Sequence, residues 1–281
     1  MFFILISKLN IKTIIISNIV FSSMGVFITL FWLRNLIKIK SLKININYLK
    51  NLFSYGFKTY LSNILSIIHS RIDVFMINLF LNPLAVGFYS VSVAMAEKLW
   101  IISQSAGLML FPRISVEKNE KNIKNFTPLV FRTTAIITII GSLLLYVLSD
   151  WLVILLFSKS FIQSIVPFKI LLIGIIALGG AGILANDLYG RGKPLINTYV
   201  NLISVFLNIT LNVIFIPKWG IIGAAWATSI SYSVTLLVIL IIYSKISKNK
   251  IKDIIFLKNS DLRLYRNILI SIKNKILRAT K

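Results

Sequence analysis

About seven apolar runs, each near 20 residues long, constrain the fold of this 281-residue chain more than any other feature. The hydrocarbon core of a bilayer takes about 20 apolar residues per helix, and the strands of a membrane barrel are about half as long. The runs therefore predict membrane-spanning helices at residues 11–33, 57–81, 88–111, 129–148, 165–185, 195–215 and 221–243. The expected fold class is all-α, a polytopic transmembrane helical bundle of about seven spans.

The composition argues against an enzyme. The chain has no cysteine and one histidine, His69, so disulfides, thiol nucleophiles and most metal sites are excluded. No glycine-rich phosphate loop, HExxH or GxSxG sequence is present, and the predicted outer turns are too short for a catalytic platform. We therefore predict no catalytic residue, no metal and no cofactor. His69 is expected to be a hydrogen-bonded interior residue more readily than a proton relay.

The basic residues alternate between the two sides of the predicted spans. The net charge of +23 would suggest nucleic acid for a soluble protein, but here Lys and Arg crowd into particular loops. Over the segments 34–58, 82–87, 113–132, 149–164, 186–194, 217–220 and 245–281 they number six, none, five, one, two, one and eleven. Because cytoplasmic loops carry the excess of Lys and Arg, this predicts an external N-terminus, a cytoplasmic C-terminus and no nucleic-acid partner.

Two basic stretches have an interfacial pattern. Residues 34–50 alternate basic and aliphatic side chains, and residues 260–281 repeat apolar side chains at helical spacing (Leu262, Tyr265, Leu269, Ile272 and Ile276). A basic amphipathic helix of this kind lies on anionic lipid. A solvated tail is the alternative interpretation.

Four charged residues lie inside the second and third predicted spans, which form a hairpin around residues 83–87. Arg71, Asp73, Glu97 and Lys98 are each 12 to 14 residues from residue 85, so they lie at one depth on neighbouring antiparallel helices. This spacing predicts the pairs Arg71–Glu97 and Asp73–Lys98. The pairs either hold the hairpin together or leave positive potential in a cavity, where Arg71, with Lys98, would bind an anionic substrate.

Polar and small residues also recur within the later spans. The sixth span carries asparagines, of which Asn201, Asn208 and Asn212 share one helix face, and they either bond across helices or line a polar path. The fifth span contains Gly174, Gly179, Gly180 and Gly182. These glycines predict close helix packing or, alternatively, a hinge.

Two long stretches resemble the second lobe of bacterial polysaccharide flippases, the O-antigen or capsule unit transporters of the multidrug/oligosaccharidyl-lipid/polysaccharide superfamily. The first is SRIDVFMINLFLNPLAVGFYSVSVAMAEKLW (70–100) followed by FPRIS (111–115), and the second is NLISVFLNITLNVIFIPKWGIIGAAWATSI (201–230). In the first stretch the family pattern is matched by Arg71, Asp73, Val86, Gly87, Tyr89, Pro112 and Ser115. The resemblance covers about residues 49–243.

This resemblance implies a domain division. Residues 1–48 would be the last helix of a first lobe with a basic cytoplasmic linker, residues 49–245 a six-helix second lobe, and residues 246–281 a basic cytoplasmic tail. Members of the family usually have 12 to 14 spans, so the chain resembles about half of a flippase. A separate chain could supply the first lobe. The sequence also lacks the proline common near the start of the second lobe, where Phe57 and Lys58 stand.

The resemblance also implies a function. The expected activity is translocation of an undecaprenyl-pyrophosphate-linked oligosaccharide across the bacterial inner membrane, for O-antigen, lipopolysaccharide or capsule synthesis, by alternating access. The candidate cavity residues are Arg71, Asp73, Glu97, Lys98, Asn201 and Asn208. The alternatives are a multidrug or cation antiporter of the same superfamily, a membrane glycosyltransferase or polymerase, and a non-transporting remnant.

Overall fold

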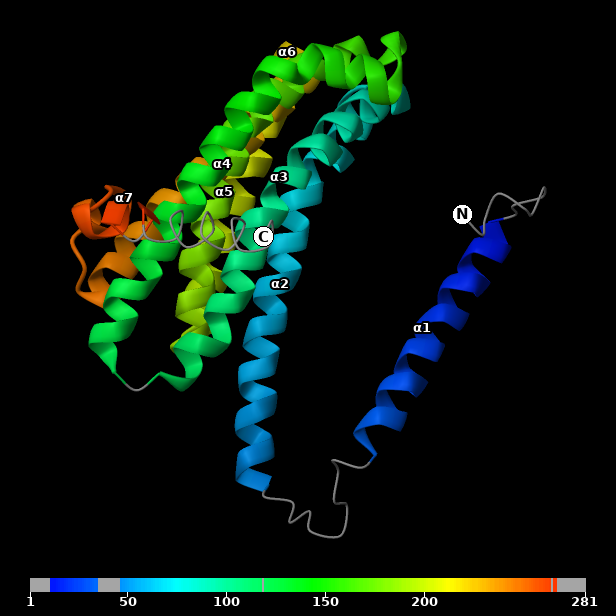
Figure 1. The fold of residues 1–281 in the computed structure, drawn as a ribbon. Coiled ribbons are helices and arrows are strands. Elements are labelled where there is room, and N and C mark those ends of the chain that lie inside the picture. Colours follow the sequence, from blue (N-terminus) through cyan, green and yellow to red (C-terminus); the bar gives the residue numbers. More distant parts are fainter. Residues whose placement is uncertain (1–10, 35–45, 118, 264, 267–281) are drawn as a thin grey trace, which may run out of the picture. The chain divides into compact units, whose positions relative to one another are not determined.

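The computed structural model describes residues 11–34, 46–117, 119–263 and 265–266, and the chain divides into two compact units, Met1–Leu52 and Phe53–Lys281. The first unit contains α1 (Ile11–Leu33), the blue helix of Figure 1 that follows the N-terminus. It is an apolar helix whose described side chains are exposed on nearly every side. Such a helix is stable only where lipid or protein covers it. Most of the basic stretch predicted at 34–50 lies outside the described residues.

The second unit is built from helices. It holds most of α2 (Ile46–Phe80), then α3 (Pro83–Val116), α4 (Glu120–Phe157), the short 3-10 helix η3 (Lys159–Ser164), α5 (Ile165–Gly190), α6 (Pro194–Ser247) and the short α7 (Ile251–Ile255). Six helices of the described chain, α1 to α6, are long and apolar enough to cross a membrane. The predicted all-α, polytopic bundle is confirmed.

The longest helix, α6, contains both the sixth and the seventh predicted spans. Its 54 residues are interrupted at Gly220, where φ is 56° and ψ is −137°, a backbone conformation open mainly to glycine. The two arms fold back on each other: Asn208 Nδ2 donates to Thr228 Oγ1 at 3.4 Å, and Ser231 Oγ donates to the Ser204 carbonyl at 2.9 Å. The six long helices therefore supply seven crossing segments.

Local sequence signals set the tight turns. Asn82 caps α3 because its Oδ1 accepts a hydrogen bond from the Ala85 N–H at 2.9 Å, and Pro83 occupies the first turn. After α5, Gly192 has φ of 71°, and the Lys193 N–H donates to the Leu188 carbonyl while the Gly192 N–H donates to the Tyr189 carbonyl. This pair of bonds is a Schellman motif, which ends α5 and turns the chain into α6.

Helix α5 is the central helix of the second unit and packs against α3, α4 and α6. It contacts both buried apolar clusters: one includes Phe168 and Leu172, and the other includes Ile183 and Leu188. Its glycines allow close approach, since a Cβ on Gly174 would lie 2.8 Å from Ser229 Cα. This contact confirms the close-packing interpretation at Gly174.

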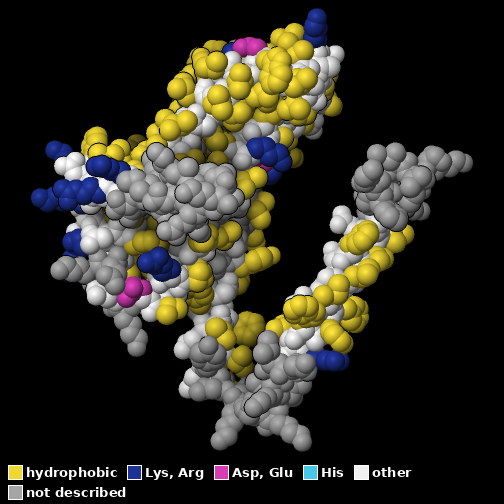
Figure 2. Space-filling model, in the orientation of Figure 1, with side chains coloured by type: hydrophobic (Ala, Val, Ile, Leu, Met, Phe, Trp, Pro, Cys, Tyr) yellow, Lys and Arg dark blue, Asp and Glu magenta, His cyan; other side chains and the backbone are white. Residues whose placement is uncertain are grey.

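The outer surface of the second unit is largely apolar. Figure 2 shows hydrophobic side chains over most of its visible face and Lys and Arg side chains gathered near α7. Among the exposed side chains are Leu143, Val147 and Leu155 of α4 and Phe206 of α6. A surface of this size and apolarity marks contact with lipid or protein, which agrees with a multi-pass membrane protein.

Candidate functional site

Arg71 of α2 and Glu97 of α3 form an ion pair between neighbouring spans. Arg71 Nη2 lies 3.2 Å from both carboxylate oxygens of Glu97, which confirms the predicted pair. The Arg71 side chain is 57% exposed in this unit and that of Glu97 is 28% exposed. Arg71 is nine residues from the end of α2, or about 14 Å along the helix axis. A charge at this depth requires a partner or a wet cavity, and the partner leaves much of the guanidinium free.

Asp73 does not pair with Lys98, so that prediction is wrong. The Asp73 side chain is buried, and its Oδ2 accepts hydrogen bonds from the Tyr89 hydroxyl at 2.5 Å and the Thr228 hydroxyl at 3.0 Å. Its Oδ1 accepts from the Val74 N–H at 2.8 Å. Lys98 is on the exposed side of α3. The hydroxyls of Tyr89 and Thr228 satisfy the Asp73 carboxylate inside the bundle, so Lys98 is not needed in the core as its partner.

The asparagines of α6 extend this network. Asn212 Nδ2 donates to Asn208 Oδ1 at 2.8 Å, and Asn208 Nδ2 donates to Thr228 Oγ1, which in turn donates to Asp73. Asn208 and Asn212 are both fully buried. Their amides therefore bond across and along helices, as the first of the two predictions for them states. Every bond along this path is donated toward Asp73, an arrangement suited to a carboxylate.

Asn201 differs from the deeper asparagines because it also faces open space. Its Nδ2 donates to the Ser62 carbonyl at 3.1 Å and the Ser62 hydroxyl oxygen at 3.2 Å, linking α6 to α2. It also lines a cavity of about 250 Å³ between α2, α3, α5 and α6. Asn201 thus matches both predictions for these side chains, helix contact and cavity lining.

His69 is an interior residue, as predicted. It is 3% exposed, its Nε2 lies 2.6 Å from Ser231 Oγ, and its ring meets Tyr232 edge-on at 4.9 Å. The single hydroxyl proton of Ser231 is donated to the Ser204 carbonyl, so we infer that His69 Nε2 is the donor. Among the described residues, no group of three or more His, Asp or Glu side chains could hold a metal ion.

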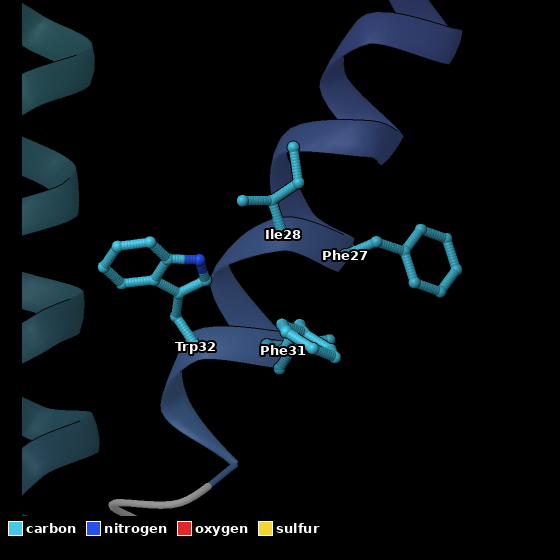
Figure 3. A pocket seen from close by; sticks show the side chains of 5 residues that line it. Phe27, Ile28, Phe31 and Trp32 are labelled. Atoms are coloured by element: carbon cyan, nitrogen blue, oxygen red, sulfur yellow. The ribbon is translucent and has the colours of Figure 1, made fainter.

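A larger hollow on α1 is lined by apolar and aromatic side chains and by no charged side chain. Figure 3 shows Phe27, Ile28, Phe31 and Trp32 projecting from this one helix, and the 610 Å³ between such side chains is open to the surface. Phe27 is 74% exposed and Trp32 is 78% exposed. Apolar side chains that point in several directions from one helix fit a lipid-facing span.

Sequence reasoning missed a buried ion pair that holds the C-terminal segment. Arg132 of α4, counted above as a loop residue, is buried and donates to Asp261 through Nε at 2.7 Å and Nη2 at 3.1 Å. Its Nη1 donates to the Asp253 carbonyl, and the Tyr265 hydroxyl lies 2.6 Å from Thr133 Oγ1. The signal was the presence of two acidic residues, Asp253 and Asp261, in a strongly basic tail.

The electrostatics of this segment follow from the pair. Burial alone would raise the pKa of Asp261, but hydrogen bonds from Arg132 and the Lys258 N–H, with the charge of Arg132, hold that pKa below its ordinary value. The segment that carries Asp261 therefore docks on α4. Leu269, Ile272 and Ile276 of the predicted lipid-surface helix lie outside the described residues, and Leu262 is 53% exposed.

Together, the fold and these contacts define a class: a polytopic helical membrane protein that encloses charged and polar groups among its spans. The sequence profile of the lipid II flippase MurJ family matches residues 2–272, and the chain belongs to this family. The family resemblance proposed from the sequence is thereby confirmed.

Similar proteins include named flippases and transporters. The chain is 28% identical over 213 residues to a probable low-salt glycan biosynthesis flippase, Agl15, of Haloferax volcanii, covering 75% of the chain and 45% of that protein. It is 28% identical over 229 residues to a putative O-antigen transporter of Shigella flexneri, covering 79% of the chain and 53% of that protein. The chain thus spans about half the length of these curated relatives.

Solved structures share the fold. A MATE crystal structure in the bent conformation superposes with a TM-score of 0.57 at 18% identity, covering 76% of this chain and 50% of that one. A transporter of the MOP superfamily from Pyrococcus furiosus superposes with a TM-score of 0.56 at 19% identity, covering 76% and 49%. These matches support the fold of one half of such a protein. They give no support to the predicted separate chain as the source of the other half.

Proposed function

We propose that the chain acts in the translocation of a lipid-linked oligosaccharide, with an undecaprenyl-pyrophosphate carrier, across the bacterial inner membrane. The observation that carries the proposal is the Arg71–Glu97 pair, a half-exposed guanidinium inside an apolar span. A guanidinium presents parallel N–H donors that match phosphate oxygens. Arg71 would therefore hold the pyrophosphate, while Glu97 orients the Arg71 guanidinium. Family membership and relatives named as a glycan biosynthesis flippase and an O-antigen transporter support the substrate class.

The proposed roles of the other candidate residues differ by position. Lys98, on the exposed side of α3, would add positive potential near Arg71. Asp73 and Asn208 would hold the helices that frame the site, because their polar atoms bond to Tyr89 and Thr228. Transport would be alternating access between residues 49–245, as one lobe, and a second lobe. The basic loops favour an external N-terminus and a cytoplasmic C-terminus.

A second candidate function is antiport of drugs or cations, which one observation favours. Asp73 is a buried carboxylate inside the bundle, and such groups attract protons or cations. Against it, the more exposed charge at the site is the cationic Arg71.

An assay in proteoliposomes distinguishes the two proposed functions. The purified protein would be reconstituted with a fluorescent undecaprenyl-pyrophosphate oligosaccharide, and the fraction accessible to an external lectin would be followed over time. We expect the accessible fraction to rise with the protein and not with empty vesicles. Failure to move this lipid, with uptake of a cationic dye driven by an ion gradient, would contradict the flippase proposal and support the antiporter.

A further inference from the structure

The 250 Å³ cavity between α2, α3, α5 and α6 has neutral walls. No Lys, Arg, Asp or Glu is among its lining residues, and most of its polar groups are carboxamides and hydroxyls. Asn63, Ser66 and Gln104 are exposed and form its mouth, whereas Asn197, at 2% exposure, forms its floor. The volume equals that of about eight water molecules and lies just below the usual range for small-molecule sites, roughly 300–1,000 Å³.

The floor of this neutral cavity has an unused hydrogen-bond acceptor. Asn197 Nδ2 donates to the Ala185 carbonyl at 3.0 Å, but Asn197 Oδ1 accepts no bond from the described residues. A buried carbonyl without a partner is unfavourable, and most such groups in proteins have a protein, water or ligand donor. At the mouth, the amide of Gln104 makes no bond within the part of the chain that the structure describes.

The walls combine these amides with flat apolar surfaces. Trp100 and Tyr189 line the cavity, and each ring pairs a large apolar face with one polar atom. The Tyr189 hydroxyl is 2.8 Å from Ser62 Oγ, which fixes the ring in place. Gly182 leaves the space open, since a Cβ built on it would meet nothing within 4 Å. Amides both donate and accept, as hydroxyl groups do, so the lining suits an uncharged ring that carries hydroxyl or amide substituents.

The neutral cavity adjoins a small hollow that Glu97, the partner of Arg71, lines. Trp100 and Leu178 line the cavity and also line this hollow beside Asp73 and Glu97. A molecule that placed a phosphate at Arg71 could therefore extend a neighbouring group past Trp100.

From these observations we propose that the neutral cavity binds one uncharged sugar residue of the transported lipid, next to its pyrophosphate. The proposal rests on the proposed function and adds a second contact to it. Arg71 recognises the charge common to all such lipids, and the cavity formed around Asn197 recognises the sugar.

The test compares two probes by native mass spectrometry of the full chain: undecaprenyl pyrophosphate, and the same lipid carrying one N-acetylhexosamine. We expect the sugar to increase affinity about tenfold in the unchanged protein, the effect of one or two hydrogen bonds. Gly182→Leu should fill the cavity and remove this preference while binding of the bare lipid persists. Gln104→Leu, at the exposed mouth, should reduce the preference several-fold without affecting folding.

Gly56→Leu is the matched control, because Gly56 is also a helical glycine with nothing within 4 Å of its Cβ position but does not line the cavity. It should leave the sugar preference intact. Equal affinity of the unchanged protein for the two lipids, or a preference that survives both Gly182→Leu and Gln104→Leu, would overturn the sugar subsite and leave the flippase proposal standing. Binding of neither lipid would contradict the proposed function and the subsite with it.

Discussion

Breaking the buried Arg132–Asp261 pair should release the C-terminal segment from α4. Both side chains are at most 5% exposed, and two charged hydrogen bonds join them. Asp261→Asn would leave the guanidinium buried without a counter-charge, and removal of one partner of a buried pair costs about 3–5 kcal/mol. The contacts that remain include the bonds from Arg132 Nη1 to the Asp253 carbonyl and between the Tyr265 and Thr133 hydroxyls. They also include the bond from Asn249 Nδ2 to the Lys124 carbonyl at 3.0 Å and the buried side chain of Ile254.

Hydrogen exchange of the backbone amides measures this opening directly. The Phe256 N–H donates to the Lys252 carbonyl and the Asp261 N–H to the Lys258 carbonyl, so both amides are protected while the segment is folded. A loss of about 3–5 kcal/mol corresponds to roughly 10²–10⁴-fold faster exchange at these amides, up to the limit set by free opening. Amides of α5 should exchange as before, because the hydrogen bonds of the Asp261 side chain go to Arg132, Lys258 and Ser260, which are not in α5.

Lys258→Met provides the control within the same segment. Lys258 Nζ pairs with Asp253 Oδ1 at 3.0 Å, but both side chains are more than 40% exposed, and exposed pairs contribute little. Exchange should therefore change little in this variant. Unchanged exchange in Asp261→Asn, or equal acceleration in the two variants, would refute the reasoning that burial makes the Arg132 pair strong.

Three further predictions follow from single features. Because the folded-state pKa of Asp261 is lowered, its stabilisation of the segment is complete above the unfolded pKa of about 3.9 and is lost as the pH falls through the folded pKa. Amide exchange of the segment, corrected for intrinsic rates, should therefore rise below about pH 4 in the unchanged protein. It should not rise in this way in Asp261→Asn. Gly220→Ala should lower unfolding free energy by about 1–3 kcal/mol in detergent, since alanine strains the backbone at φ 56° and ψ −137°, whereas Gly56→Ala, in a regular helix, should not. Since the chain has no cysteine, single cysteines at Leu84 and Lys218 should react with a membrane-impermeant maleimide from one side. Single cysteines at Lys124 and Lys248 should react from the other side, because the second arm of α6 returns to it. Reaction of Lys218 and Lys248 from the same side would disprove the fold-back of α6.

Patterns of hydropathy and spacing predicted the features that depend on local sequence or on short separations along the chain. Apolar length gave the spans, and equal distance from the turn at 83–87 gave the Arg71–Glu97 pair. Helix ends were less predictable: α4 begins at Glu120, well before the predicted start at 129, because a helix continues through polar residues outside the hydrocarbon. The position of the break in α6 could be predicted because Pro217 and Gly220 interrupt the apolar sequence between residues 195 and 243.

Contacts between distant segments were beyond sequence reasoning. The hydroxyl of Thr228, 155 positions after Asp73, satisfies that carboxylate and leaves Lys98 outside. Arg132 was counted as a loop base, but Asp261, 129 positions later, draws it into a buried pair. The neutral cavity needs α2, α3, α5 and α6 together, and no spacing within one helix indicates that Asn63, Gln104 and Asn197 share it.

The most direct test of the account is the dependence of lipid binding on Arg71. Native mass spectrometry or thermophoresis would compare undecaprenyl pyrophosphate with undecaprenol for the unchanged protein, Arg71→Gln and, as a control on exposed charge, Lys218→Gln. We predict that the pyrophosphate increases affinity about 10- to 100-fold through charge-assisted hydrogen bonds, and that Arg71→Gln removes most of this gain while Lys218→Gln keeps it. Equal binding of the two lipids by the unchanged protein, or a gain that survives in Arg71→Gln, would contradict the account.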